Sequence, residues 1–183
     1  MLVVLLLSLG VVSGEVPRGP LKPASSPAGG GETRPDPEAA HRIFEHFAKL
    51  AGEWRGRSTA GWSDRTVFRV IAAGSVVVAT SEFEAHPGET MMTMYHLDGD
   101  RMMLTHYCVA RNQPRLQVSS VDTDLKRVVF TFRDGTNLTS RDQGHMDQVV
   151  YEFLDEDHFS SRWSFYKEGR EDWMEEIHFE RIR

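Results

Sequence analysis

The feature that most constrains this chain is a series of short segments in which apolar and polar residues alternate. The series begins at Glu53 and recurs roughly every ten residues. Turn-forming pairs such as Ala73-Gly74, Pro87-Gly88 and Asp98-Gly99 separate the segments. An alternation with a period of two is typical of β-strands. Because most of the links are too short for a crossover helix, we expect neighbouring strands to pair antiparallel, in an up-and-down order.

The pattern predicts an all-β fold of about ten strands. The expected strands are Glu53 to Ser58, Arg65 to Ile71, Ser75 to Glu84, Glu89 to Leu97, Arg101 to Val109, Arg115 to Val121, Arg127 to Arg133, Met146 to Leu154, His158 to Lys167 and Trp173 to Arg181. Closure into an antiparallel up-and-down β-barrel is favoured because it leaves no unpaired edge, and an open sandwich is the alternative. A barrel somewhat larger than eight strands has room for one small ligand.

The segment before the strands divides into three parts. Residues 1–14 form an apolar run that ends in Ser13-Gly14, which predicts a signal peptide and export to the periplasm or the medium. The run is too short to span a bilayer, so a membrane anchor is the weaker alternative. Residues 15–35 are rich in Pro, Gly and Ser and predict a flexible linker. The folded domain is expected to cover residues 36–183.

One N-terminal α-helix is predicted to cover an end of the barrel. Asp36 is suited to cap it, Pro37 to begin it and Gly52 to end it. The residues of its apolar stripe are Ile43, Phe44, Phe47 and Leu50.

Composition narrows the class of protein. The chain has 183 residues, of which 40% are hydrophobic and 26% charged, as expected for one globular domain. Its net charge of -6 argues against nucleic acid and anionic membrane surfaces as partners. Cys108 is the single cysteine and cannot form an intrachain disulfide, so stability must come from a core. No standard catalytic or phosphate-binding motif is present, and no cofactor is predicted.

Asp98-Gly99 predicts a tight hairpin. With these two residues as the loop, Leu97 pairs with Asp100, Tyr95 with Met102, Thr93 with Leu104 and Met91 with His106. Leu104, His106 and Cys108 then share a face with Tyr95. A loop longer by one residue would instead place Met92, Met94 and His96 on that face. Pro114 is expected to end the strand ladder because it has no N–H.

Several short motifs resemble known barrel families. Leu50-Ala51-Gly52-Glu53-Trp54 resembles the first-strand motif of the calycin superfamily, which implies that Arg181 or Arg183 stacks on Trp54. A wider set resembles a bacterial lipocalin-like family, a domain of unknown function often found in exported proteins. That set is Tyr95-His96-x-Asp98-Gly99-Asp100, Thr105-His106-Tyr107-Cys108, Asn112-Gln113-Pro114-Arg115, His145-Met146 and Trp163-x-Phe165-Tyr166. A haem-binding barrel of the nitrobindin type is a further resemblance, with His178 as the only candidate ligand.

Polar and aromatic residues predict a small-molecule pocket inside the barrel. The candidate ligand-binding residues are Tyr95, His106, Cys108, Asn112, Gln113, Arg115, His145 and Trp163. Residues expected to have structural roles are Gly52, Trp54, Asp98, Gly99 and Arg181. The simplest alternative is that the cluster satisfies its own hydrogen bonds inside a filled barrel.

The sequence thus predicts an exported protein that binds a small, partly hydrophobic molecule of unknown identity, without fixing an oligomeric state. Two rival functions are a lyase- or isomerase-like enzyme, with Glu82 or Asp147 orienting His106 or His145 as the base, and a structural or partner-binding module. His106 and Cys108 also have the spacing of two metal ligands on one strand, with His145 or His96 as the third.

Overall fold

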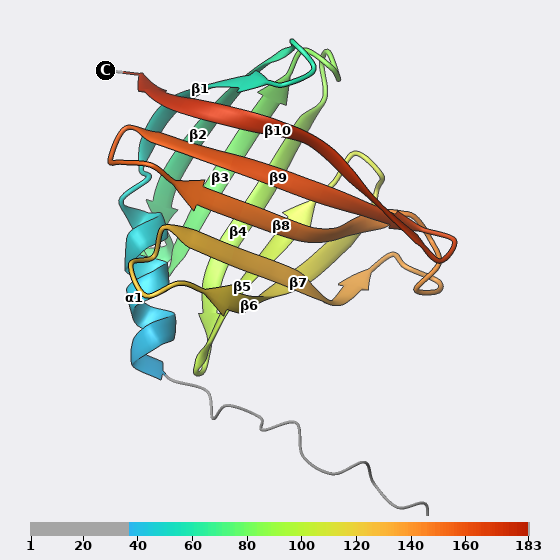
Figure 1. Cartoon of the computed structure of the whole chain (residues 1–183). Helices are drawn as coiled ribbons and strands as arrows, with labels where there is room; N and C mark the ends of the chain where they lie inside the picture. The colour runs from blue at the N-terminus through green and yellow to red at the C-terminus, as the bar shows by residue number, and fades with distance from the viewer. Residues whose placement is uncertain (1–36, 183) are drawn as a thin grey trace, which may run out of the picture. The chain divides into compact units, whose positions relative to one another are not determined.

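A computed structural model describes residues 37–182, in which one α-helix lies against a closed barrel of ten strands (Figure 1). The predicted signal peptide, linker and Asp36 cap lie outside the described residues. The elements are α1 (Pro37–Ala48), β1 (Gly52–Ser58), β2 (Ser63–Ile71), the 3-10 turn η1 (Ala72–Gly74), β3 (Val76–Phe83), β4 (Thr90–Asp98), β5 (Arg101–Tyr107), β6 (Gln113–Val121), β7 (Arg127–Thr136), β8 (His145–Phe153), β9 (His158–Lys167) and β10 (Arg170–Ile182).

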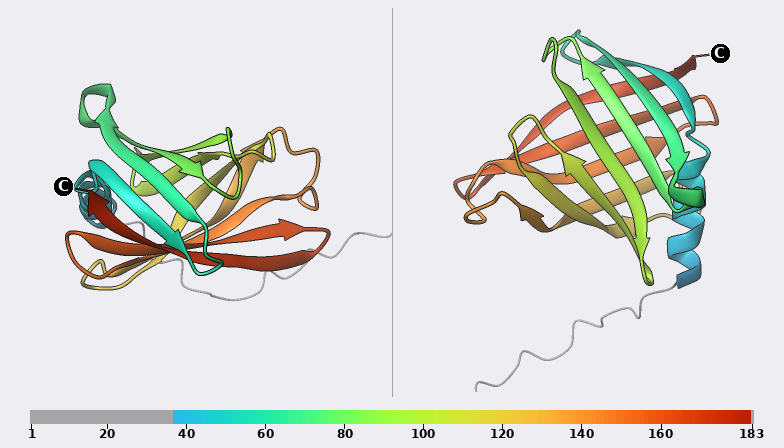
Figure 2. Two further views of the ribbon diagram at one scale, coloured as in Figure 1. Left: turned by 90° about the horizontal axis from the view of Figure 1, so that it is seen from above. Right: turned by 180° about the vertical axis from the view of Figure 1, so that it is seen from behind.

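Each strand pairs antiparallel with its neighbours in sequence, and β1 pairs with β10 to close the barrel (Figure 2). The predicted all-β up-and-down barrel is therefore confirmed, and the open sandwich is excluded. Closure leaves the sheet without an edge strand. No helix within residues 37–182 is long and apolar enough to cross a membrane.

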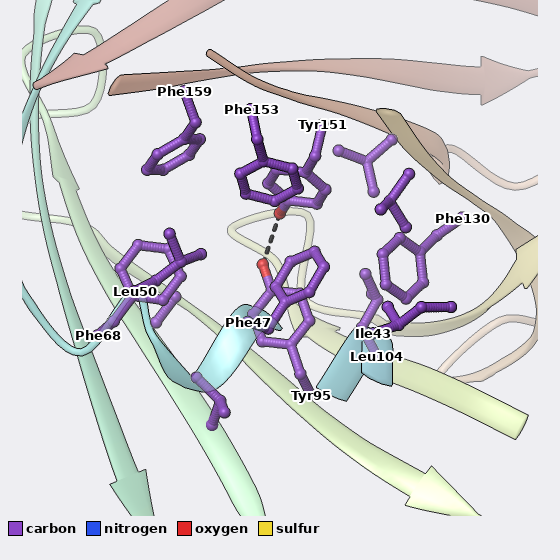
Figure 3. Close-up of a cluster of buried hydrophobic side chains, with 14 of the residues drawn as sticks. Ile43, Phe47, Leu50, Phe68, Tyr95, Leu104, Phe130, Tyr151, Phe153 and Phe159 are labelled. Carbon is purple, nitrogen blue, oxygen red and sulfur yellow. Dashed lines mark hydrogen bonds between the residues drawn. The ribbon is translucent and has the colours of Figure 1, made fainter. Parts of the chain in front are cut away.

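Helix α1 covers one end of the barrel, as predicted, because its apolar stripe faces the core. Phe47 is fully buried, and its ring centroid lies 4.8 Å from that of Tyr95 and 5.2 Å from that of Tyr151. The hydroxyl oxygens of Tyr95 and Tyr151 are 2.5 Å apart and form a hydrogen bond in the middle of this cluster (Figure 3). Phe130 and Phe153 complete the ring contacts around Phe47. The half of the barrel next to α1 is thus filled with aromatic side chains.

The helix ends before the residue that the sequence indicated. Its last residue is Ala48, whereas Gly52 begins β1 with a φ of +134°. A Cβ on Gly52 would lie 3.1 Å from Arg181 Nη1, so glycine is required here by both its backbone conformation and the close approach of Arg181.

Arg181 joins the last strand to the first, in the contact that the calycin resemblance implies. Its guanidinium carbon lies 4.2 Å from the ring centroid of Trp54, within cation–π range. Its Nη1 and Nη2 donate to the backbone carbonyls of Ala51 and Lys49. Trp54 is fully buried and donates its indole N–H to the carbonyl of Leu50 at 2.7 Å.

The β4–β5 hairpin has a different register from the predicted one. Asp98 pairs with Arg101, so the loop residues are Gly99 and Asp100, with Gly99 at a φ of +62°. Gly99 thus occupies the first loop position, where its positive φ is available to glycine without strain, and this explains the shift. Tyr95 faces Leu104 instead of Met102. Because the register differs by two residues, the side chains of β4 and β5 keep their predicted faces.

Pro114 lies just beyond the last pair of the β5–β6 ladder, as predicted, but it does not end the β6 strand. It lies within β6, opposite Gly135 of β7, and only the ladder with β5 stops at the next residue, Arg115. The missing N–H is tolerated on the side of β6 that has no partner at this point.

Candidate functional site

The end of the barrel opposite α1 contains a cavity of about 100 Å³. Loops that join β1 to β2, β3 to β4 and β5 to β6 reach over it. Its lining residues are Trp62, Phe83, Ala85, His86, Met91, His106, Val109, Met146, Trp163, Met174, Glu175 and Ile177. We call this the outer cavity. Its walls are mostly aromatic and sulfur-containing side chains.

A second cavity of about 50 Å³, here called the inner cavity, extends toward the filled half of the barrel. The two cavities share Phe83, Met91, His106, Trp163 and Ile177, so they are neighbours inside one barrel. The inner cavity is the more polar one. Its polar lining residues are Asp64, Thr66, Ser81, Thr93, Tyr95, His106, Tyr151 and Ser161.

Asp64 is the acidic residue of the inner cavity, and its side chain is not fully satisfied. It is 3% exposed, and Thr66 donates to its Oδ1 at 2.6 Å, whereas its Oδ2 has no hydrogen-bond partner. Burial raises the pKa of Asp64 to about 7, although the Thr66 hydrogen bond opposes the shift. Gly56 on β1 makes room for the Asp64 side chain, because a Cβ on Gly56 would lie 2.7 Å from the Cβ of Asp64.

His106 is the second buried group with a free polar atom. Its Nδ1 lies 2.9 Å from Thr93 Oγ1, and its ring centroid lies 4.8 Å from that of Trp163. The residue is 5% exposed, and its Nε2 has no partner. Burial lowers the pKa of His106 to about 4, so the imidazole is neutral near pH 7. Asp64 and His106 therefore both line the inner cavity, and each has one buried polar atom without a partner.

A β-bulge shapes the mouth of the outer cavity. The β9–β10 register shifts between Trp173 and Glu176, where Met174 and Glu175 line the cavity. Bulges often redirect side chains in this way. Glu175 Oε1 accepts a hydrogen bond of 2.7 Å from the indole N–H of Trp62, which ties the β1–β2 loop to the bulge.

The structure brings together three of the predicted ligand-binding residues, Tyr95, His106 and Trp163, which all line the inner cavity. Cys108 does not share their strand face, because β5 ends at Tyr107 and Cys108 lies in the following turn. Burial raises the pKa of the Cys108 thiol. Asn112 is buried but donates to the carbonyl of Gly144, away from both cavities.

Gln113 and Arg115 face outward, contrary to the prediction. Gln113 Oε1 accepts from Thr136 Oγ1, and the Arg115 guanidinium forms an ion pair with Asp134 at 2.5 Å on the surface. Both belong to β6, whose inward positions are held by Pro114 and Leu116. The alternation along the strand thus places Arg115 outside the barrel.

His145 belongs to a separate cluster beside the mouth. Its Nδ1 lies 2.6 Å from the carbonyl oxygen of Gln143, and its Nε2 interacts with Arg141. The Arg141 guanidinium stacks on the rings of Phe132 and Tyr166, with centroids at 4.6 and 3.9 Å. These contacts fasten the β7–β8 loop to the barrel and occupy both nitrogens of His145.

The enzyme, metal and haem hypotheses receive less support from the geometry. Asp147 Oδ1 does lie 3.4 Å from His145 Nε2, but Glu82 lines an exposed outer groove rather than the His106 cavity. Within residues 37–182, no three His, Cys, Asp or Glu side chains are grouped to hold a metal ion, as the His106–Cys108 hypothesis requires. His178 is exposed on the outer face of β10, so it is not the internal ligand that the nitrobindin resemblance implies.

Asp64 and its partners were missed by the sequence analysis. Asp64, Thr66 and Phe68 occupy successive inward positions of β2, and this alternation was visible in the sequence. A charged residue at an inward position, with Gly56 opposite it on β1, was the signal that could have indicated a buried polar site.

Three larger hollows lie on the surface of the described domain. One of about 820 Å³ is lined by Arg55, Arg65, Glu82 and Glu84 and also reaches Asp64, one of about 540 Å³ lies beside the end of α1, and one of about 230 Å³ lies on the outer face of β8 and β9. All three are open to solvent and carry side chains of both signs, which water can hydrate. The buried, unsatisfied atoms of Asp64 and His106 therefore make the internal cavities the better candidate site.

Fold and site together define a closed ten-stranded barrel that has one end filled and a small, partly polar cavity at the other. No family model and no curated protein sequence matches the chain. Similar solved structures include a protein of unknown function from the DUF3598 family of Nostoc punctiforme, with 12% identity and a TM-score of 0.48 over 74% of this chain and 49% of that one. Rv2717c from M. tuberculosis has 12% identity and a TM-score of 0.49 over 77% of this chain and 98% of its own. This chain spans about half the length of the Nostoc protein.

Proposed function

We propose that this protein binds a small, partly hydrophobic molecule reversibly in the neighbouring inner and outer cavities. The observation that carries the proposal is the pair of buried polar atoms, Asp64 Oδ2 and His106 Nε2, that no protein group satisfies. A buried polar group without a partner costs about 1–3 kcal/mol. A polar head group of a ligand, or water in its place, would recover that free energy.

The size of the cavities limits the ligand. They measure about 100 and about 50 Å³, and an apolar cavity of about 150 Å³ in another protein holds benzene. A single ring or a short chain with one polar group therefore fits, and a long-chain lipid does not. The unbranched side chains of Met91, Met146 and Met174 can adjust to ligands of different shape.

The sequence supports placing this binding outside the cytoplasm. We propose export on the strength of the signal-like residues 1–14, and a lipocalin-like ancestry on the strength of the Gly52-x-Trp54 motif with Arg181.

Methionine methyl groups offer a direct test. Met91, Met146 and Met174 line the outer cavity, whereas Met92 and Met94 lie on the outer face of β4. In protein labelled with ¹³C at the methionine methyls, we expect benzyl alcohol to cause saturable NMR shifts at the first three residues. The signals of Met92 and Met94 should stay unchanged.

A matched pair of serine variants identifies the cavity. Ser161 lines the inner cavity, and Ser160, the preceding residue of β9, lines a surface hollow on the outer face. Ser161→Leu should fill the inner cavity and weaken benzyl alcohol binding at least tenfold, and Ser160→Leu should leave it unchanged. Shifts that do not saturate, or equal binding by a folded Ser161→Leu variant, would show that the proposal is wrong.

A further inference from the structure

We infer that the molecule bound in these cavities carries a primary ammonium group, which pairs with the carboxylate of Asp64. The inference rests on the proposed function and adds the chemical class of the ligand.

The charge state of Asp64 is the first argument. Within residues 37–182, no Lys, Arg or His forms an ion pair with this carboxyl group. Removing an unpaired carboxylate from water is costly, and a cation at the same depth offsets that cost. The unpartnered Oδ2 is the position where such a cation can bind.

The neighbouring hydroxyl groups favour the ionised carboxyl. Thr66 Oγ1 donates to Asp64 Oδ1 at 2.6 Å, so its own oxygen is left to accept from Ser81 Oγ, also at 2.6 Å. The chain Ser81 to Thr66 to Asp64 thus directs two O–H groups toward the carboxylate. Hydrogen bonds of this polarity stabilise a charged acceptor.

Donor and acceptor types agree with an ammonium group, which has three donors and no acceptor. Asp64 Oδ2 is an acceptor. When the Nδ1–H of His106 donates to Thr93 Oγ1, the free His106 Nε2 is a second acceptor. An alcohol could also bind here, but it would leave the carboxylate without a counter-ion.

The walls of the cavities favour a cation over an anion. No Lys or Arg lines either cavity. The outer cavity is lined by the aromatic side chains of Trp62, Phe83 and Trp163, and the inner cavity by further Phe and Tyr side chains, and the faces of aromatic rings attract cations. Glu175 adds a negative charge at the mouth. A small amine with an apolar or aromatic body matches this lining.

The test compares three probes of one shape but different charge: benzylamine, benzyl alcohol and benzoate. Each is titrated into the full chain at about pH 8, where the Asp64 carboxyl is mostly ionised, and the methyl signals of Met91, Met146 and Met174 are followed. We expect benzylamine to bind at least tenfold more tightly than benzyl alcohol, and benzoate to bind most weakly.

Two variants assign the preference to one carboxylate. Asp64→Asn keeps the shape of the side chain and the acceptor for Thr66, so the chain should stay folded, and the ratio of benzylamine to benzyl alcohol affinity should fall from at least ten to about one. Glu82→Gln removes the same charge from the exposed outer face of β3 and should change neither affinity.

The possible failures can be told apart. If benzyl alcohol binds at the cavity methyls as tightly as benzylamine, or if Asp64→Asn keeps the benzylamine preference, the amine inference is wrong and the proposed binding function stands. If none of the three probes shifts these methyls, both are wrong.

Discussion

The buried carboxyl group of Asp64 lowers the free energy of unfolding of the barrel near neutral pH. A buried carboxyl group with a pKa of about 7 holds its proton more tightly in the folded chain than in the unfolded chain, where the pKa is near 3.8. The free energy of unfolding therefore falls as pH rises from about 4 to about 7, and it stays low above pH 7. The lowered pKa of His106 acts in the opposite direction, so its contribution is lost as pH falls from about 6.5 to about 4.

Asp64→Asn should remove the first of these effects. At pH 8 the variant should be more stable than the wild type by at most about 4 kcal/mol, because the pKa of Asp64 is about 7 in the folded chain and near 3.8 in the unfolded chain. At pH 4 the two proteins should differ little. Urea unfolding at both pH values measures this, with Glu82→Gln as the control. Parallel pH profiles for the Asp64→Asn variant and the wild type would contradict the assignment.

Strand alternation made Tyr95, His106 and Trp163 predictable as inward-facing residues. Arg115 was placed wrongly because Pro114 was expected to end the strand ladder, whereas the alternation of Pro114 and Leu116 indicates that Arg115 faces outward. Asp64 was overlooked for a different reason. The expected strand began at Arg65, whereas β2 begins at Ser63, so the inward position of Asp64 was not counted in the alternation.

Among the elements, α1 closes one end of the barrel. Its side chains fill the space that the strands leave open, and Phe47 lies at the centre of the aromatic cluster. The helix was predictable because Ile43, Phe44 and Phe47 repeat with helical spacing. The bulges in β8 and β10 were not, because they depend on how each strand meets its partner.

Phe47→Ala should destabilise the barrel by about 3–5 kcal/mol, because the lost ring leaves a cavity that the rigid strands cannot close. His41 is an exposed residue of the same helix, and His41→Ala should change stability by no more than about 0.5 kcal/mol. Urea unfolding monitored by tryptophan fluorescence compares the two variants. A loss below about 1 kcal/mol for Phe47→Ala would mean that α1 is not an essential part of the core.

At the scale of the whole molecule, the filled half of the barrel sets the capacity of the site. Aromatic rings occupy the space next to α1, and only about 100 and 50 Å³ remain in the two cavities at the other end. A barrel of this strand number has room for a larger ligand only when its interior is less completely packed.

Oleate should therefore fail to compete with benzyl alcohol for the cavities. Displacement of benzyl alcohol, followed through the methyl signals of Met91, Met146 and Met174, measures this directly. Because an anionic head group is itself disfavoured in these cavities, a neutral pair separates size from charge: 1-butanol should compete and oleyl alcohol should not. Competition by oleate or by oleyl alcohol would show that the barrel opens to admit long chains.

The sequence by itself determined the strand number and order, the covering helix and the inward face of most strands. These features depend on local patterns: a period of two, a period of 3.6, and glycine where a turn requires positive φ. Only the tertiary structure decided the register of the β4–β5 hairpin, the bulges, and the meeting of Asp64 on β2 with His106 on β5 around one cavity. Those outcomes depend on how side-chain volumes from all ten strands fill a closed interior, and no local pattern records that sum.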